Sequence, residues 1–321
     1  MISSMTNIQA SIEALRKHPH ILDKKHISRT HRYLGDAVSG SLYSSQSKHS
    51  IQLGDDAAAI LQHDGSYLLL AAEGIVSYFL EKDPWFAGYS AVMVNISDIC
   101  AMGGLPIAVT DTLYAKDEID STQIWEGMLA ASEAYGVPIV GGHTCYHSEN
   151  KALSVSILGK ATDKLLTSFE AKPGDDVLLA IDQKGAYYKE YAFWNASTTT
   201  TPERLRMLTK LPYEIANKNL SVAAKDVSMG GIIGTLCMLL NSSEVGAEMD
   251  LEAITKPEEV AWEKWLSSFP SYGYIFACAK ENSADIQQLF SEANINCDVI
   301  GKIAAKKDEL WINYNNDRIK F

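Results

Sequence analysis

The chain has 321 residues, of which 46% are hydrophobic and 21% are charged, and its formal net charge is −12. This composition is typical of a globular protein and the length is sufficient for two domains, so a wholly disordered chain is excluded. The acidic balance argues against general nucleic-acid binding, which requires clustered Lys and Arg to neutralise phosphates.

The distribution of cysteines and of apolar residues predicts a soluble cytoplasmic protein. The five cysteines are widely spaced and form no C-x-x-C pair, so a zinc site of that kind and a thioredoxin-like pair have no support. The N-terminus has no charged-then-apolar signal pattern. No stretch approaches the roughly 20 apolar residues that cross a bilayer, so we expect no membrane partner.

The first predicted element is an N-terminal helix. Thr6 and Gln9 form a capping-box pattern, and Ile8, Ile12 and Leu15 form an apolar stripe at helical spacing. The segment 16–32 that follows is locally basic and contains four of the eight histidines. Two interpretations of this segment stay open: a solvated surface segment, or a mobile arm that meets anionic groups of a ligand.

From about residue 50, short apolar runs alternate with longer helical patterns. Asp83 and Pro84 supply an N-cap and a first helical residue, Gly103 and Gly104 end that helix, and Gly136 closes the next one. This alternation predicts a sheet with helices packed on one face. We expect strands at 68–72, 107–113, 137–140 and 152–160, and helices at 84–102 and 122–135.

A break in the pattern at residues 163–174 predicts two domains, 1–165 and 166–321. The polar tract 195–201 is expected to be an exposed loop, or one that covers a ligand cleft. The fold class is therefore α+β, with two domains of mixed helix and sheet. In the second domain we expect strands at 177–181, 246–251, 272–279 and 298–303, and helices near 213–224, after Gly231 and at 283–293.

Acidic residues flank the first two apolar runs of this pattern. Asp55 and Asp56 are adjacent carboxylates that precede an apolar run, and Glu73 follows a strand, where a carboxylate can point into a site beyond the sheet. The alternatives are a plain turn for the aspartates and a capping or solvent contact for Glu73.

A second acidic feature lies inside a strongly apolar helix. Asn95 and Asp98 are three residues apart and share one helix face, with little solvent-facing surface around them. Burying a lone carboxylate is costly, so Asp98 should have a partner cation or hydrogen-bond donors. A structural hydrogen-bonding role is the alternative interpretation.

Two glycine-rich segments are predicted at turns that follow strands, where backbone N–H groups approach an anion closely and a helix dipole assists. They are Gly141, Gly142, His143 and Thr144 in the first half, and Asp226 followed by Gly230 and Gly231 in the second. Each segment alone is a generic signal. His143 is equally consistent with a structural histidine.

Together the acidic positions predict a magnesium site. The carboxylates concerned are Asp55, Asp56, Glu73, Asp98 and Asp226. Two carboxylates about 4 Å apart repel by roughly 4 kcal/mol at an effective dielectric constant of about 20. An Mg²⁺ ion that bridges them to nucleotide phosphates neutralises both sides. The sequence has no Walker A pattern, no kinase-type glycine loop with a matching Lys, and no G-x-S-x-G elbow.

In their order and spacing, the acidic and glycine-rich segments described above resemble those of the aminoimidazole ribonucleotide synthetase superfamily. This superfamily includes thiamine-monophosphate kinase, selenophosphate synthetase and the hydrogenase-maturation dehydratase. The likeness covers residues 50–305. It implies a homodimer paired through the N-terminal domains, and Mg-ATP in an acidic cleft that phosphorylates a small-molecule substrate. By position, the resemblance implies magnesium ligands at Asp55, Asp56, Glu73 and Asp98, of which Asp56 and Asp98 are expected to be catalytic. It also implies a nucleotide site that includes residues 141–144 and Asp226. We assign Asn95 to the same nucleotide site.

Three departures separate the chain from the characterised members. Glu73 stands where the family usually has Asp, Met229 replaces the second Asp of an Asp-Val-Ser-Asp-Gly motif, and His143 replaces the Asp of Gly-Gly-Asp-Thr. The leading hypothesis is an ATP- and Mg-dependent kinase or synthetase that acts on a small metabolite. The alternative is a non-catalytic Mg-nucleotide-binding protein with a regulatory or structural role.

Overall fold

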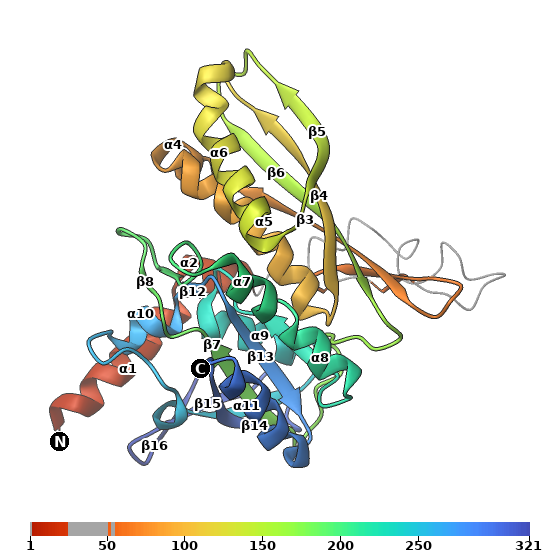
Figure 1. The fold of residues 1–321 in the computed structure, drawn as a ribbon. Coiled ribbons are helices and arrows are strands. Elements are labelled where there is room, and N and C mark those ends of the chain that lie inside the picture. The colour runs from red at the N-terminus through yellow and green to blue at the C-terminus, as the bar shows by residue number, and fades with distance from the viewer. Residues whose placement is uncertain (1, 25–50, 53–54) are drawn as a thin grey trace. The chain divides into compact units, whose positions relative to one another are not determined.

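The computed structural model describes residues 2–24, 51–52 and 55–321. These residues form two compact units, which Figure 1 shows. The N-terminal unit contains residues 51–52, 55–165 and 200–214, and the C-terminal unit contains residues 2–24, 166–199 and 215–321. Gly54 and residues 25–32 of the basic segment, with His26 and His31, lie outside the described residues.

The N-terminal unit is built on a six-stranded sheet in the order β1-β2-β3-β6-β4-β5. Neighbouring strands are antiparallel except β4 and β5, which run parallel and are joined by helix α6. The strands are β1 Ile51–Gln52, β2 Ala58–Leu61, β3 Tyr67–Ile75, β4 Leu105–Tyr114, β5 Ile139–Cys145 and β6 Ala152–Ala161. The helices are α4 Ser77–Lys82, α5 Pro84–Ala101, α6 Glu118–Tyr135 and α7 Pro202–Leu208.

Helices α5 and α6 lie against each other over one face of this sheet (Figure 1). The sequence allows this because each helix carries a glycine where the partner backbone comes close. A Cβ atom built at Gly88 would lie 2.1 Å from the Ile124 carbonyl oxygen, and one at Gly127 would lie 1.9 Å from the Trp85 carbonyl oxygen. Gly136, with a φ of 70°, ends α6 as predicted.

The opposite face of the sheet, called the open face below, carries exposed apolar side chains among the described residues. Side chains alternate along each strand, so Leu69 and Ala71 of β3 are buried under the helices while Leu70 between them is 49% exposed. Leu158 of β6 and Tyr114 of β4 are exposed on the same open face, since Leu158 is paired opposite Leu70 across the β3–β6 ladder. The sheet therefore presents apolar side chains to solvent.

Residues 200–214 return from the second half of the sequence to the N-terminal unit. Thr201 caps α7 by accepting a hydrogen bond from the Arg204 N–H. Arg206 of α7 donates to the carbonyl oxygens of Glu133 and Ala134, at 2.5 and 3.2 Å, in the last turn of α6. This arginine satisfies carbonyl groups that a helix end leaves open.

The C-terminal unit has a seven-stranded sheet in the order β10-β13-β7-β14-β11-β15-β16, antiparallel except for the β11–β15 pair, and a small β12-β9-β8 sheet. The large sheet contains β7 Asp176–Ile181, β10 Ala223–Asp226, β11 Gly246–Asp250, β13 Gly273–Cys278, β14 Asn296–Ala304, β15 Leu310–Tyr314 and β16 Asp317–Lys320. The small sheet contains β8 Ala186–Tyr187, β9 Phe193–Asn195 and β12 Phe269–Pro270. The helices are α1 Ile2–Arg16, α2 Pro19–Lys24, α8 Leu211–Asn217, α9 Gly231–Ser242, α10 Trp262–Leu266 and α11 Ser283–Glu292, with α8 starting in the N-terminal unit.

The N-terminal helix packs in the C-terminal unit, although the sequence assigned it to the first domain. Its predicted stripe of Ile8, Ile12 and Leu15 is confirmed as buried, and these side chains join the core of the C-terminal unit. The capping box is wrong, because α1 begins at Ile2 and Thr6 lies inside the helix. A second segment of chain thus completes the C-terminal unit.

Two further local predictions are corrected. Residues 223–224 belong to strand β10 rather than to a helix, because α8 ends at Asn217. The polar tract is not an exposed loop at its start, since Asn195 and Ser197 are buried. The Asn195 Oδ1 atom accepts from the backbone N–H groups of Ser197 and Thr198, which folds the tract into a closed turn.

Candidate functional site

The structure brings two of the predicted carboxylates together in the N-terminal unit. Asp98 lies on α5 and is only 7% exposed, and Asp56 lies in the turn before β2. Their carboxylate oxygens come within 4.8 Å of each other. The turn is held in part by the Asp56 N–H, which donates to the Asp55 carboxylate at 3.0 Å. Two acidic groups at this separation repel unless a cation or hydrogen-bond donors balance them.

The donor set of this pair fits a hard divalent cation. Carboxylate oxygens are the protein ligands that Mg²⁺ prefers, and Mg²⁺ is commonly held by one or two carboxylates together with substrate phosphates. The pair consists of oxygen ligands alone, whereas Zn²⁺ sites draw on Cys and His. Among the described residues of the N-terminal unit, Asp56 and Asp98 are therefore candidates to hold a magnesium ion.

Asn95 and Glu73 lie outside this carboxylate pair. Asn95 is fully buried, and its side-chain amide donates to the Ala91 carbonyl oxygen at 2.8 Å, one turn earlier in α5. Glu73 lies inside β3 rather than after it, and its backbone carbonyl accepts from the Ser154 hydroxyl. Because side chains alternate along a strand, Glu73 lies on the same face of the sheet as Leu69 and Ala71. Unlike those two residues, Glu73 is exposed.

The first glycine segment is part of a strand, which corrects its prediction as a turn. Residues 141–144 lie within β5 and pair in register with β4. Gly142 is required by close packing, because a Cβ atom there would lie 2.1 Å from the Asp111 carboxylate. The pairing between β4 and β5 includes residues 141–144. The backbone N–H groups of these residues are therefore not gathered at the start of a helix, as an anion-binding turn requires.

Asp111 is a buried acidic residue that was not among the predicted site residues. It lies on β4 between the buried Val109 and Leu113, on the face covered by the helices, and it is 4% exposed. Neither of its carboxylate oxygens has a hydrogen-bond partner among the described residues. Burial raises the pKa of this carboxyl group, and the contact with its own backbone N–H offsets the rise only in part. In the sequence, Asp111 is two residues from both Val109 and Leu113, so the alternation of the strand places this carboxylate on the side that faces the core.

The second glycine segment forms the predicted turn in the C-terminal unit. Strand β10 ends at the buried Asp226, and helix α9 begins at Gly231, whose φ is 65°. A Cβ atom at Gly231 would lie 2.4 Å from the Leu266 carbonyl oxygen, so both the backbone angle and the packing demand glycine. The Ser228 N–H donates to the Thr235 hydroxyl, which fixes the turn on the first turn of α9. A helix start of this kind attracts anions.

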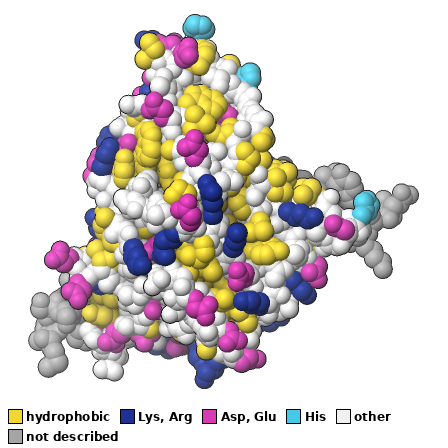
Figure 2. Space-filling model, viewed as in Figure 1, with side chains coloured by type: hydrophobic (Ala, Val, Ile, Leu, Met, Phe, Trp, Pro, Cys, Tyr) yellow, Lys and Arg dark blue, Asp and Glu magenta, His cyan; other side chains and the backbone are white. Residues whose placement is uncertain are grey.

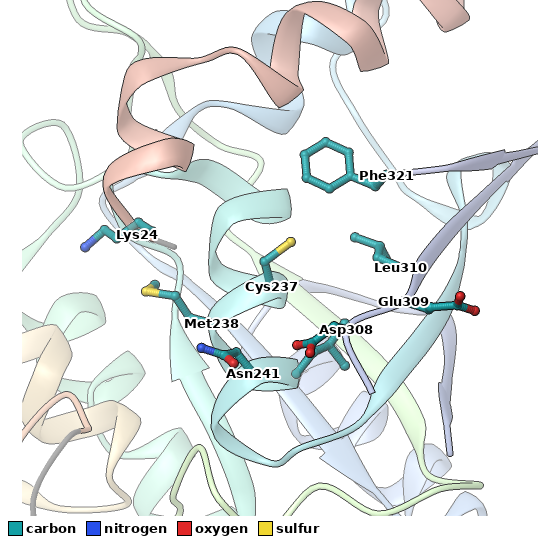
Figure 3. A pocket seen from close by; sticks show the side chains of 9 residues that line it. Lys24, Cys237, Met238, Asn241, Asp308, Glu309, Leu310 and Phe321 are labelled. Carbon is teal, nitrogen blue, oxygen red and sulfur yellow. The ribbon is translucent and has the colours of Figure 1, made fainter. Parts of the chain in front are cut away.

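A separate cavity of about 310 Å³ lies in the C-terminal unit beside α9 (Figure 3). Figure 3 shows Cys237 and Met238 of α9 on one side, and Leu310 and Phe321 on the other. Lys24 of α2 also lines this cavity and packs near Gly230. None of the predicted site residues lines it.

The surface shows mixed charge on the face drawn in Figure 2, where Lys and Arg side chains are interspersed with Asp and Glu. Among the described helices, none has both the length and the apolar character to cross a membrane.

Family models match most of the chain. Residues 54–161 match the AIR synthase related protein, N-terminal domain, and residues 173–312 match the AIR synthase related protein, C-terminal domain. The uncharacterized protein sll0787 of Synechocystis sp. is 46% identical over 255 residues, which are 79% of each chain. The uncharacterized protein MJ0640 of Methanocaldococcus jannaschii is 36% identical over 84% of each chain. The thiamine-monophosphate kinase of Buchnera aphidicola subsp. Schizaphis graminum is 26% identical, over 84% of this chain and 89% of the kinase.

Solved structures share the fold. T. maritima PurL complexed with ADP superposes with a TM-score of 0.70 at 21% identity, over 83% of this chain and 45% of PurL, so the chain spans about half the length of that protein. AaThiL complexed with AMPPCP and TMP superposes with a TM-score of 0.66 at 18% identity, over 92% of this chain and 95% of that one. The predicted α+β architecture of two domains is thereby confirmed.

Proposed function

The chain belongs to the AIR synthase related family, and on this premise we propose that it is an enzyme that uses ATP and Mg²⁺ to phosphorylate an oxygen atom of a small metabolite. The observation that carries the proposal is the pair of carboxylates, Asp56 and Asp98, within 4.8 Å of each other in the N-terminal unit. An acidic protein that binds a polyanion needs such a site for a counter-cation. The names of the relatives add support, since thiamine-monophosphate kinase is among them.

Each unit offers one feature that suits the proposed reaction. Asp56 and Asp98 would hold Mg²⁺, which when bound neutralises phosphate charge and orients the transferred group. In the C-terminal unit, the turn from Asp226 to Gly231 offers the start of α9 to a phosphate group. Phosphoryl transfer depends on positioning and charge stabilisation more than on a covalent role for the protein, and each of these features suits that kind of chemistry.

The proposal includes a homodimer and a cytoplasmic location. The open face of the N-terminal sheet exposes Leu70, Tyr114 and Leu158, and apolar side chains gathered on one sheet face are typical of a surface that pairs with another protein surface. None of the five cysteines, all of which lie among the described residues, forms a disulfide bond, which supports a reducing compartment.

Calorimetry with ATP tests the magnesium site. Because phosphates and carboxylates repel, ATP binding should be at least tenfold tighter in Mg²⁺ than in EDTA, which corresponds to about 1.4 kcal/mol. Equal affinity in the two buffers would contradict the site. A screen of small metabolites for accelerated ADP release then tests turnover. Binding of Mg-ATP with no turnover across the screen would favour the non-catalytic alternative.

A further inference from the structure

The end of β5 presents two soft metal-binding groups on the open face of the N-terminal sheet. His143 and Cys145 are two residues apart on one strand, so their side chains point to the same side. The Cys145 Sγ atom lies 3.7 Å from the His143 Nε2 atom. His143 is exposed, and Cys145 is half-buried and is a free thiol.

The separation of these two atoms matches that of two ligands on one tetrahedral ion. Zn²⁺ binds Cys sulfur at about 2.3 Å and His nitrogen at about 2.0–2.1 Å, and at the tetrahedral angle these bonds place sulfur and nitrogen about 3.6 Å apart. The observed distance of 3.7 Å needs little adjustment. The pairing of β5 with β4 fixes both positions, since His143 is in register with Thr112 and Cys145 with Tyr114.

The chemistry of this pair differs from that of Asp56 and Asp98. Imidazole and thiolate favour Zn²⁺ and other borderline-soft ions, whereas Mg²⁺ requires oxygen ligands. The two sites are also on different elements, because Asp98 is on α5 and Asp56 precedes β2. One chain can therefore carry a hard-ion site and a separate site that selects softer ions.

We propose that His143 and Cys145 form a binding site for a borderline-soft divalent cation of the Zn²⁺ class. This site goes beyond the proposed phosphoryl transfer and does not depend on it. Water fills the two remaining positions of the ion, or the same pair from a second copy of the chain does. A site with open positions can polarise a ligand as a Lewis acid, whereas four protein ligands make a structural site.

Titration with Co²⁺ alone tests the proposal, because cobalt bound to a thiolate absorbs in the near-ultraviolet through charge transfer from sulfur. The full-length protein is stripped of metal, kept reduced and titrated. We expect a saturable band that Zn²⁺ abolishes and that excess Mg²⁺ leaves unchanged. The affinity should rise with pH, since the thiol loses its proton on binding. An end-point of one ion per chain identifies water as the other ligand, and half an ion per chain identifies a second copy.

Matched variants locate the ligands. Cys145→Ser should lose the band, and His143→Ala should weaken Co²⁺ binding by tenfold or more. Cys237→Ser, which removes the other half-buried thiol, should keep the band. Circular dichroism confirms that each variant is folded.

The proposal is overturned if the band persists in Cys145→Ser, or if folded wild-type protein gives no band at about 100 µM Co²⁺, well above the dissociation constant of a micromolar site. If the protein shows no band and Cys145 is alkylated faster than Cys237, the metal site is overturned and the two residues are instead a thiol–imidazole pair with a reactive thiol. Mg-ATP affinity, measured on the same preparations, reports separately on the proposed function, so failure of one assignment does not decide the other.

Discussion

Asp98 and Asp111 are both buried carboxylic acids of the N-terminal unit, and their surroundings give them different roles. Asp98 has a second carboxylate within 4.8 Å, whereas no charged side chain contributes to the raised pKa of Asp111. A paired arrangement of acids favours a cation, and an isolated buried acid favours its neutral form. The two residues therefore respond differently to loss of the negative charge.

The change Asp98→Asn should weaken Mg-dependent ATP binding by tenfold or more, about 1.4 kcal/mol or above. The amide keeps the size of the side chain and removes the repulsion with Asp56, so the melting temperature without ligand should stay the same or rise slightly. Calorimetry and thermal denaturation on one preparation measure both quantities. The exposed Asp163, changed to Asn, is the control and should alter neither. A destabilised Asp98→Asn protein that binds Mg-ATP normally would refute the metal-ligand role.

The change Asp111→Asn should stabilise the protein at neutral pH. Because the pKa of this carboxyl group is raised in the folded state, its proton favours folding at low pH, and that contribution is lost as the pH rises from the ordinary value of 3.8 through the raised one. The variant has no such loss, so its melting temperature should exceed that of the wild type by a margin that grows with pH.

Paired melting curves at about pH 4 and about pH 7.5 measure this margin, and the wild-type comparison removes the contribution of other acids. A margin that shrinks with rising pH would mean that Asp111 is stabilised as a carboxylate. If Asp111→Asn is more stable but binds ligand less tightly, Asp111 contributes to ligand binding although its buried carboxyl group destabilises the fold.

At the scale of elements, the close approach of α5 and α6 organises the helix layer of the N-terminal unit. Gly88 and Gly127 face the partner backbone at distances that no side chain tolerates. Asp98 is on α5, so the position of its carboxylate over the sheet depends on the packing of α5 against α6. A glycine inside a helix is normally a weakness, and here it permits the contact.

The change Gly127→Ala should therefore destabilise the protein by about 1–3 kcal/mol, although alanine is the better helix former. The added methyl group would lie 1.9 Å from the Trp85 carbonyl oxygen and would force the helices apart. Gly234 of α9 is the matched control, because the nearest atom to its added Cβ is 3.5 Å away. Gly234→Ala should be neutral or stabilising by up to about 1 kcal/mol. Urea denaturation of both variants measures the difference, and equal effects would contradict the packing argument.

At the scale of the whole molecule, the open face of the N-terminal sheet determines the expected assembly. Light scattering at micromolar concentration should give about twice the chain mass of 35.2 kDa. Leu70→Lys places a charge on the exposed apolar face and should shift the protein toward the monomer. Ile119→Lys, at an 86% exposed position on α6, is the control and should leave the mass unchanged. A wild-type mass of one chain, or a dimer that survives Leu70→Lys, would count against this face.

Much of the local structure could be predicted from the sequence. The stripe of Ile8, Ile12 and Leu15, the start of α5 at Pro84 and the end of α6 at Gly136 are all observed as predicted. Strand β6 alternates buried and exposed residues as its sequence does. These features follow from backbone hydrogen bonding and side-chain periodicity within a few residues, which the sequence states directly.

Long-range pairing decided the rest. Residues 141–144 read as a glycine turn, but pairing with β4 extends them into a strand. The same pairing sets Gly142 against Asp111 and places His143 and Cys145 on the open face, and no local pattern marks these neighbours. Side-chain periodicity and helix-ending residues indicate helices such as α5 and α6 and strands such as β6, and the sequence supplies acidic candidates such as Asp56 and Asp98. Which of those residues meet is a property of the folded chain, because strand register and helix packing join segments that lie far apart along the chain.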